Sequence, residues 1–378
     1  MGDQRNFVWS GMMIERIYID NYRTLVNCEI NLRAVSLLLG PNSTGKSSVL
    51  DLTRTIKRFV GGVGLVSELF PSTNLTRWQS LDEQIFEIDL RTTHGLCRYA
   101  LRLKHAQDRR RCRVLSEALA VDQKPLFSFA DGQIQLFNDL HEPGPKMSYD
   151  WNRSGLAAIY ARHDNIKLTE FKQRLESTLF LRPCPQIMET DSPEEAEELD
   201  LAGLNFPSWY RFIARQDISR QLDLLSELRQ VIEGFDSLRL EGPADSTVTL
   251  RVLIKPDGAK APLPFKFGEL FDGQRQLIVL HALLFGMSDE KRVLFLDEPD
   301  NYLAPREVEP WLTALIDAPG RSISQAIIIS HHPEVIDHLA KEKGIWFTRD
   351  SAGLTRVETG RADDTTRLRP SEVEARGW

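Results

Sequence analysis

Apolar side chains stand at every second position over residues 86–90 and again over 99–103, with charged or small residues between them. Residues 92–96, between these two segments, are typical of a turn. Because successive side chains of a strand point to opposite faces, the alternation predicts an antiparallel hairpin with one buried face and one charged face.

The first 60 residues predict strands, a loop and a helix, in that order. Apolar positions recur over 14–19 and alternate over 28–32, which indicates two strands. A continuous apolar run at 35–39 is typical of a strand buried on both faces. After a glycine-containing loop, apolar residues recur at helical spacing up to Val60.

The pattern changes between residues 140 and 240, where helical spacing dominates. Residues 169–182 and 208–233 are predicted to be helical, and Ser192 is predicted to cap a helix with Pro193 in its first turn. No heptad repeat persists beyond two or three turns, so no long coiled coil is expected. Alternation returns at 248–254. The chain thus predicts an α/β protein with a helix-rich insertion.

Composition narrows the class of protein. The 378 residues are 42% hydrophobic and 27% charged, with a formal net charge of −7, which argues against non-specific coating of nucleic acid by the whole surface. No apolar run approaches the length of a membrane helix, and residues 1–13 lack the apolar centre of a signal peptide. The scattered cysteines suggest neither a zinc site nor disulfides; they are Cys28, Cys97, Cys112 and Cys184. We therefore expect a reduced, cytoplasmic protein without membrane partners.

The loop after the buried strand has the form G-x-x-x-x-G-K-S, which is a phosphate-binding pattern. Its candidate nucleotide-binding residues are Gly40, Pro41, Asn42, Ser43, Thr44, Gly45, Lys46, Ser47 and Ser48. The glycines let backbone N–H groups point at phosphate oxygens, and the following helix N-terminus favours an anion. Lys46 would reach the β- and γ-phosphates of ATP, and Ser47 would coordinate Mg²⁺. The alternative is a chance glycine-rich turn, but the strand and helix around it favour the phosphate site.

A second apolar run, at 293–296, ends in Asp297 and Glu298. An acidic residue at such a strand end holds the Mg²⁺ shell of a phosphate site, so Asp297 is the candidate metal ligand. Glu298 is placed to polarise the attacking water. The alternative is a strand end with two exposed acids.

A third apolar strand, at 326–329, ends in Ser330 and His331. His331 follows Glu298 by one predicted helix and one predicted strand, a spacing that suits a contact with the γ-phosphate. A structural histidine is the alternative, and it is the interpretation favoured for His332.

Gly273 and Gln274 open a strongly apolar helix ahead of the acidic strand. A helix N-terminus with no phosphate loop of its own can bind a phosphate presented by another molecule. An ordinary helix start is the alternative.

Together these motifs resemble the ABC-type ATPases of the SMC, RecF and OLD class. Gly40–Ser48 is similar to their Walker A motif, Leu270–Gln274 to the signature, Val293–Glu298 to Walker B and Ser330–His331 to the switch. The resemblance covers residues 13–104 and 246–347, and the N-Y-R sequence at 21–23 is similar to the start of that class.

The resemblance implies an ABC-type P-loop head, with a mixed sheet core and an antiparallel β subdomain. Residues 1–140 would be its N-terminal part, 141–245 a helical insertion and 246–378 its C-terminal part. It also implies a homodimer or larger assembly in which ATP lies between Walker A of one subunit and the signature of another. The short insertion and the S-H-H-P sequence look like AAA-family ATPases of prokaryotic anti-phage operons.

Three positions depart from the pattern of the class. Phe271 replaces the serine whose hydroxyl would touch the partner's γ-phosphate, and Ala304 stands where Asp or His is usual. Slow turnover or an altered contact is therefore expected. Gln79 and Gln84 are both candidates for the glutamine loop, and a plain loop role is equally open for each.

A basic cluster follows the predicted hairpin and is the candidate contact for nucleic acid or an acidic partner. Its members are Arg98, Arg102, Lys104, Arg109, Arg110, Arg111 and Arg113. The alternative is a set of solvated charges. The acidic stretch 189–200 is interpreted as an exposed helix start.

The sequence after His331 is too short for the Toprim nuclease domain of OLD relatives, so no nuclease is expected in this chain. We expect a Mg²⁺-dependent ATPase that acts as a nucleotide-gated sensor or clamp and controls a separately encoded effector, such as a nuclease, in phage defence. The main alternative is a RecF-like DNA-repair ATPase without a toxic partner. A transporter ATPase and a non-hydrolysing scaffold are less consistent with N-Y-R and with intact Lys46, Asp297 and Glu298.

Overall fold

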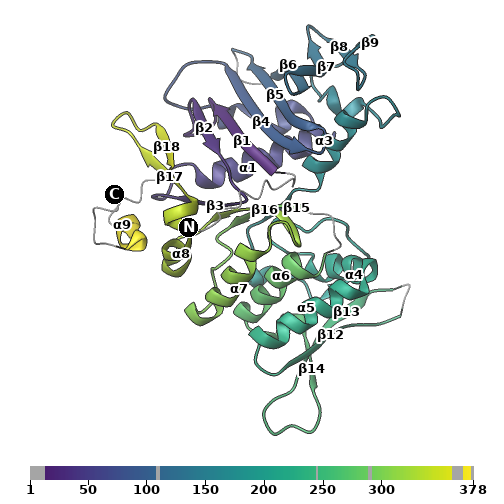
Figure 1. Ribbon diagram of the computed structural model, residues 1–378, viewed down its shortest axis with the longest axis vertical. Helices are drawn as coiled ribbons and strands as arrows, with labels where there is room; N and C mark the ends of the chain where they lie inside the picture. The colour runs from purple at the N-terminus through teal and green to yellow at the C-terminus, as the bar shows by residue number, and fades with distance from the viewer. Residues whose placement is uncertain (1–12, 108–110, 244–245, 288–291, 360–368, 376–378) are drawn as a thin grey trace, which may run out of the picture. The chain divides into compact units, whose positions relative to one another are not determined.

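The computed structural model describes residues 13–107, 111–243, 246–287, 292–359 and 369–375. They form two compact units (Figure 1). Unit 1 contains the described residues of 13–178 and 343–359, and unit 2 contains those of 179–342 and 369–375. Each unit is described by itself below.

Unit 1 is built on an antiparallel sheet with the strand order β2-β1-β4-β5-β6-β7-β8-β9 (Figure 1). The strands are β1 (Met13–Asp20), β2 (Cys28–Asn31), β4 (Glu83–Thr92), β5 (Gly95–His105), β6 (Cys112–Val121), β7 (Lys124–Ala130), β8 (Gln133–Phe137) and β9 (Pro143–Ser148). In the β4–β5 hairpin Ile88 faces Tyr99 and Phe86 faces Leu101, and all four are buried. The hairpin predicted from the alternation is therefore confirmed.

Three helices of unit 1 bury apolar side chains against this sheet: α1 (Lys46–Val60), α2 (Val66–Leu69) and α3 (Ile166–Glu176). Phe70, directly after α2, stacks on Phe86 of β4 and meets Phe59 of α1 edge to face. Tyr99 of β5 stacks on Phe171 of α3. These aromatic contacts form the core under the sheet. Two 3₁₀ turns, η1 (Ser72–Asn74) and η2 (Leu156–Ala158), complete the layer.

The remaining strands of unit 1 carry the phosphate-binding loop. β17 (Gly344–Arg349) runs parallel to β3 (Val35–Leu39), and β18 (Thr355–Thr359) pairs antiparallel with β17. Every residue of β3 is buried, as the continuous apolar run predicted.

Unit 2 contains a parallel arrangement of β10 (Leu179–Leu181), β15 (Arg292–Asp297) and β16 (Ile323–Ile329). The helices α6 (Asp272–Phe285), α7 (Pro305–Asp317) and α8 (Pro333–Lys343) belong to the same unit. Helix α6 is buried along most of its length, which explains why it is apolar on all sides.

A second, antiparallel sheet in unit 2 has the order β11-β13-β12, with β14 paired to β13. Its strands are β11 (Asp191–Ser192), β12 (Phe235–Glu241), β13 (Val248–Ile254) and β14 (Leu263–Lys266). The helices α4 (Phe206–Gln216) and α5 (Ile218–Val231) confirm the helical pattern of 208–233. Two 3₁₀ turns, η3 (Pro185–Ile187) and η4 (Phe267–Glu269), and the short α9 (Pro370–Ala375) complete the described elements.

Two local predictions are wrong. The helix predicted to start at Ser192 does not form: Ser192 ends β11, pairs with Val248, and its hydroxyl donates to the carbonyl of Glu194. The helix predicted over 169–182 ends at Glu176, because the chain continues into β10 beside β15. The segment 141–245 contains β9 to β12 as well as α3 to α5. Its role as one insertion stays a prediction; the boundary between the units lies at 178/179.

The fold class is the predicted one, α/β with parallel and antiparallel sheets. The longest helix among the described residues, α1, has 15 residues, so that part of the chain contains no long coiled coil. Within the same ranges, no helix has both the length and the apolar character needed to cross a membrane.

Candidate nucleotide-binding and catalytic residues

The phosphate-binding loop joins β3 to α1, and its two conserved-pattern glycines are required by geometry. Gly40 has φ of 132°, and a Cβ there would lie 2.0 Å from the carbonyl oxygen of Phe347. Gly45 has φ of 103°, and a Cβ there would lie 2.8 Å from the side chains of Thr24 and Leu25. Only glycine adopts such backbone angles without strain and permits these approaches.

Lys46 lies inside the loop that it follows. Its Nζ donates to the carbonyl oxygens of Gly40 and Pro41, and the residue is almost fully buried. Thr44 Oγ1 also donates to Pro41, at 2.8 Å. The ammonium group is thus placed at the centre of a backbone cradle, where an anionic ligand could replace the carbonyl contacts with stronger charged ones.

The first turn of α1 suits an anion. Helix α1 starts at Lys46 and has no acidic residue in its first turn. The first N–H groups of a helix have no partner within it, and they carry the positive end of its dipole. Pro41, Asn42 and Ser43 are exposed at the loop tip, whereas Thr44 to Lys46 are buried.

Side chains from the far end of the chain hold this loop. Thr355 Oγ1 donates to the carbonyl of Thr44 at 2.8 Å, and the Arg349 guanidinium donates to the carbonyl of Ser43. Arg23, of the N-Y-R sequence, pairs with Asp51 of α1 at 2.7 Å and contacts Ser48 Oγ at 3.3 Å. The loop is therefore fixed from three separate segments of unit 1.

Asp297 ends β15 and is buried, and its carboxylate is held by Arg182. The Nε and Nη2 of Arg182 lie 2.7 and 2.6 Å from Oδ2 of Asp297. Sequence reasoning missed Arg182. The pairing of β10 with β15 brings it to Asp297, and no local pattern reports that pairing.

Glu298 has a backbone conformation that non-glycine residues rarely adopt, with φ of 51°. Its N–H donates to the carbonyl of Ile329 at 2.8 Å, and Asn301 Nδ2 donates to its Oε2 at 2.7 Å. Such left-handed residues occur where surrounding contacts over-determine the backbone, and they concentrate at functional sites.

A buried polar group lies beside the end of β16. Asp300 is buried, its side chain hydrogen-bonds with that of Ser330, and burial raises the pKa of the Asp300 carboxyl. Ser330 Oγ also accepts from the N–H of His332 at 3.0 Å. His331 itself is half-buried directly after the strand. Asp300 is a second residue that the sequence analysis did not single out, although it lies in the same D-E-P-D run as Asp297.

The predicted signature lies at the start of α6. Phe271 precedes the helix in an extended conformation and is 80% exposed. A Cβ on Gly273 would lie 2.8 Å from the carbonyl oxygen of Tyr302, so this glycine permits a close backbone approach. Gln274 Oε1 accepts from the N–H of Phe271 at 3.3 Å, and Arg275 pairs with Asp272.

The two glutamine-loop candidates differ. Gln84 is fully buried; its Nε2 donates to the carbonyl of Asn21 at 2.8 Å and its Oε1 lies 3.0 Å from Nε2 of His105. Gln84 therefore has a structural use. Gln79 is half-buried, and its Nε2 has no hydrogen-bond partner among the described residues. Ala304 caps α7, where its N–H donates to Glu307.

Part of the predicted basic cluster is neutralised by acids. Arg98 pairs with Asp89 through two contacts of 2.7 Å, and Arg102 pairs with Glu83 at 3.1 Å. Lys104 shares Glu83 at 3.4 Å. These cations therefore offer less free charge than the sequence suggested. Arg109 and Arg110 lie outside the described residues, and Arg111 and Arg113 are exposed.

The donor set fits Mg²⁺ and a nucleotide. The hydroxyl of Ser47 and the carboxylate of Asp297 are hard oxygen ligands of the kind that Mg²⁺ prefers. Asp297 already has a cationic partner in Arg182, so its surroundings favour a positive charge. Gly40–Ser48 lie in unit 1, and Asp297, Glu298, His331, Gly273 and Gln274 lie in unit 2.

Comparison with known proteins bears on the class. Residues 12–65, which include the phosphate-binding loop, match the family model described as the AAA ATPase domain. No curated protein sequence matches the chain.

Two solved structures show the fold. An SMC head bound to the C-winged helix domain of ScpA has a TM-score of 0.55 at 13% identity, over 91% of this chain and 97% of that chain. An SMC head domain with an extended coiled coil, bound to the C-terminal domain of ScpA derived from Pyrococcus furiosus, has a TM-score of 0.55 at 14% identity, over 92% and 96%. The chain therefore has the fold of an SMC head. In class it is an AAA ATPase of the SMC-head type, as the motifs predicted.

Proposed function

We propose that this chain binds and hydrolyses ATP with Mg²⁺, pairs with a second copy around the nucleotide, and thereby controls a separately encoded effector in anti-phage defence. The observation that carries the proposal is the loop of Gly40 and Gly45 around the buried ammonium of Lys46. A cationic centre in a backbone cradle at a helix start is built for a polyphosphate.

Each proposed site residue has a chemical role that its surroundings support. The loop N–H groups and Lys46 bind the β- and γ-phosphates, and Ser47 and Asp297 hold Mg²⁺. Bound Mg²⁺ neutralises charge on the phosphates. Glu298 orients and polarises the attacking water, and Asn301, which donates to its Oε2, fixes the direction of the carboxylate. His331 contacts the γ-phosphate and reports its presence.

Pairing of two heads is supported by the start of α6. Phe271 exposes a large apolar ring next to Gly273 and Gln274, the residues proposed to meet the partner's γ-phosphate. A single exposed aromatic side chain costs little on a free surface, yet aromatic anchors dominate interfaces when they are buried. We infer that the ring packs on the second copy when ATP joins the heads.

Control of a separate effector is supported by two observations. The two SMC heads of similar fold were each solved with a domain of a partner protein, ScpA. A head of this fold can therefore carry another polypeptide. An ATPase cycle changes only shape and partner affinity, through differential binding to the open and closed states. The S-H-H-P sequence after β16 resembles defence ATPases and supports the biological setting.

The test of ATP pairing uses Glu298→Gln. This variant should bind ATP and Mg²⁺ but hydrolyse slowly, so that light scattering shows more paired species with ATP than the wild type does. Arg58→Ala, an exposed cation of α1, is the control and should behave like wild type. Pairing that ignores ATP in Glu298→Gln would contradict the proposal.

The test of the effector assignment is a nuclease assay on the purified chain with ATP and Mg²⁺ or Mn²⁺. We expect no cleavage of DNA or RNA by the chain alone. Cleavage should require a second polypeptide from the same operon and respond to Lys46→Ala. Cleavage by the wild type alone that is lost in Lys46→Ala would place a nuclease site in this chain.

A further inference from the structure

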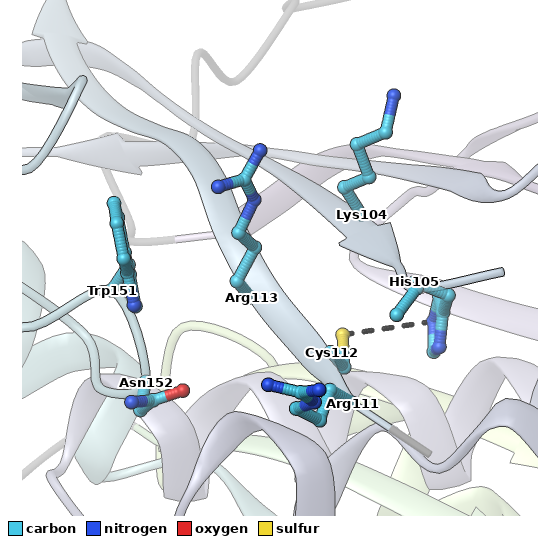
Figure 2. A pocket seen from close by; sticks show the side chains of 8 residues that line it. Lys104, His105, Arg111, Cys112, Arg113, Trp151 and Asn152 are labelled. Carbon is cyan, nitrogen blue, oxygen red and sulfur yellow. Dashed lines mark hydrogen bonds between the residues drawn. The ribbon is translucent and has the colours of Figure 1, made fainter. Parts of the chain in front are cut away.

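A pocket of about 350 Å³ opens where β5 ends and β6 begins, and the segment at 151–152 forms its other side (Figure 2). Three cations from the two strands line it: Lys104, Arg111 and Arg113. Trp151 and Asn152 face them. Its volume falls in the range of small-ligand sites, large enough for roughly one nucleotide.

The lining is positively charged and has no carboxylate among the described residues. Arg111 and Arg113 are both exposed, and no ion pair within the described ranges involves either. Lys104 is partly compensated, since it shares Glu83 with Arg102. The uncompensated charge of the predicted basic cluster is therefore concentrated at Arg111 and Arg113, whereas Arg98 and Arg102 are paired.

An exposed aromatic ring stands beside these cations. Trp151 is 47% exposed, and the Arg113 guanidinium lies over its ring at 5.4 Å from the centroid (Figure 2). The carbonyl of Trp151 accepts from the N–H of Val114 at 2.8 Å, which ties the segment to β6. The ring is thus a fixed platform with one cation already stacked on it.

The inner wall of the pocket is neutral and rigid. His105 is buried, and its Nε2 lies 3.0 Å from Gln84 Oε1 and 3.7 Å from Cys112 Sγ (Figure 2). Burial raises the pKa of the Cys112 thiol to about 12, so this group stays protonated at neutral pH. The wall adds neither a negative charge nor a reactive thiolate that would oppose an anion.

We propose that this pocket binds single-stranded nucleic acid, with a backbone phosphate on Arg111 and Arg113 and an unpaired base on the face of Trp151. Arginine forks match phosphate oxygens, and aromatic rings beside a basic groove stack unpaired bases whatever their sequence. A duplex keeps its base faces covered by stacking, so the exposed Trp151 favours a single strand. The inference does not depend on the proposed ATPase cycle, because none of these residues belongs to the phosphate-binding loop.

The experiment measures fluorescence anisotropy of a labelled oligothymidine of about 20 nucleotides, longer than one aromatic-lined binding site requires. Trp151→Ala should weaken binding at least about tenfold, and Trp151→Phe should restore most of the affinity. Arg113→Ala should weaken binding and lower the slope of log affinity against log salt by about 0.7 for one lost phosphate contact. The same changes should appear in Lys46→Ala, which separates this site from the ATPase proposal.

Trp78→Ala is the matched control. Trp78 is 43% exposed and also lies under an arginine, Arg349, at 6.0 Å, but it lies outside the pocket. This variant should bind like wild type, and thermal unfolding should show that all variants fold. Equal affinity of wild type and Trp151→Ala would overturn the proposal. So would tighter binding of the matched duplex, which indicates a backbone site for double strands, or displacement by poly-glutamate that is equally effective in Trp151→Ala, which indicates an acidic protein partner.

Discussion

The guanidinium group of Arg182 covers the buried carboxylate of Asp297, with two nitrogens 2.6 and 2.7 Å from the same oxygen. The Asp297 side chain is 3% exposed, whereas that of Arg182 is 43% exposed. The carboxylate proposed to hold Mg²⁺ therefore has a cationic partner of its own, and that partner can move into solvent. We expect Arg182 and Mg²⁺ to compete for Asp297.

Arg182→Met should reveal this competition. Without Mg²⁺ the variant should be less stable, by about 2 kcal/mol, because a buried carboxylate loses its charged partner. Added Mg²⁺ should raise Tm more in the variant than in the wild type. Arg251→Met, which removes the more exposed pair with Glu241, should lower stability less and show no added Mg²⁺ effect. An equal Mg²⁺ response in Arg182→Met and wild type would contradict competition.

Lys46→Ala should abolish tight ATP binding without unfolding unit 1. The lost contacts in the described structure are to two loop carbonyls, whereas the lost contacts to ATP are charge-assisted. We expect at least a hundredfold weaker binding, from roughly 3 kcal/mol of lost charged contacts, measured by calorimetry beside Arg58→Ala. ATP binding and turnover at wild-type levels would remove the phosphate-loop assignment.

Phe271→Ala tests the proposed interface anchor. In a Glu298→Gln background, loss of the ring should reduce ATP-dependent pairing by about tenfold in affinity, because interface aromatics contribute on the order of 1–2 kcal/mol or more. Ile218→Ala removes a comparably exposed apolar side chain, 78% exposed, from the start of α5 and should leave pairing unchanged. Sedimentation velocity distinguishes the two variants, and equal pairing in both would show that Phe271 is not at the interface.

The buried Glu117 should give unit 1 a pH-dependent stability. Burial raises the pKa of its carboxyl, although Ser154 donates to it at 2.6 Å and Gly155 N–H at 2.7 Å. The contribution of this group to stability is full below its unfolded pKa of 4.5 and is lost as pH rises through the higher folded pKa. Urea unfolding from pH 4.5 upward should therefore show declining stability.

Glu117→Gln should flatten this pH dependence. The variant should also be less stable at every pH, by about 1–3 kcal/mol, because its amide cannot accept from the backbone N–H groups that Glu117 binds. The exposed Glu142→Gln is the control and should keep the wild-type slope. A wild-type slope in Glu117→Gln would assign the pH dependence to another group.

The sequence predicted the elements whose signals are local. The apolar run of β3, the glycines of the loop and the helix α1 follow one another within 26 residues of the chain, so their order alone indicated the phosphate site. The fold class and the β4–β5 hairpin were likewise written in periodicity. The register of that hairpin, which sets Arg98 opposite Asp89, could also have revealed that this arginine is neutralised.

Long-range pairing explains what the sequence could not predict. Ser192 and Pro193 carry a local helix-start signal, but pairing of Ser192 with Val248 prevails over it. Arg182 reaches Asp297 only because β10 lies beside β15, which is 115 residues away in the pair concerned. The pocket at Trp151 combines a strand end with a loop about 40 residues later, and only the β6 contact at Val114 joins them.

The dependence of the phosphate loop on Phe347, Arg349 and Thr355 has a consequence for biosynthesis. A ribosome releases the glycine loop early, but the strands β17 and β18 that complete its supports emerge only near the end of translation. Nascent chains would thus carry the loop sequence for most of their synthesis without the contacts that hold it in shape. The cell then gains a simple safeguard, since the capacity to capture nucleotide arrives together with the finished polypeptide and truncated products remain inert.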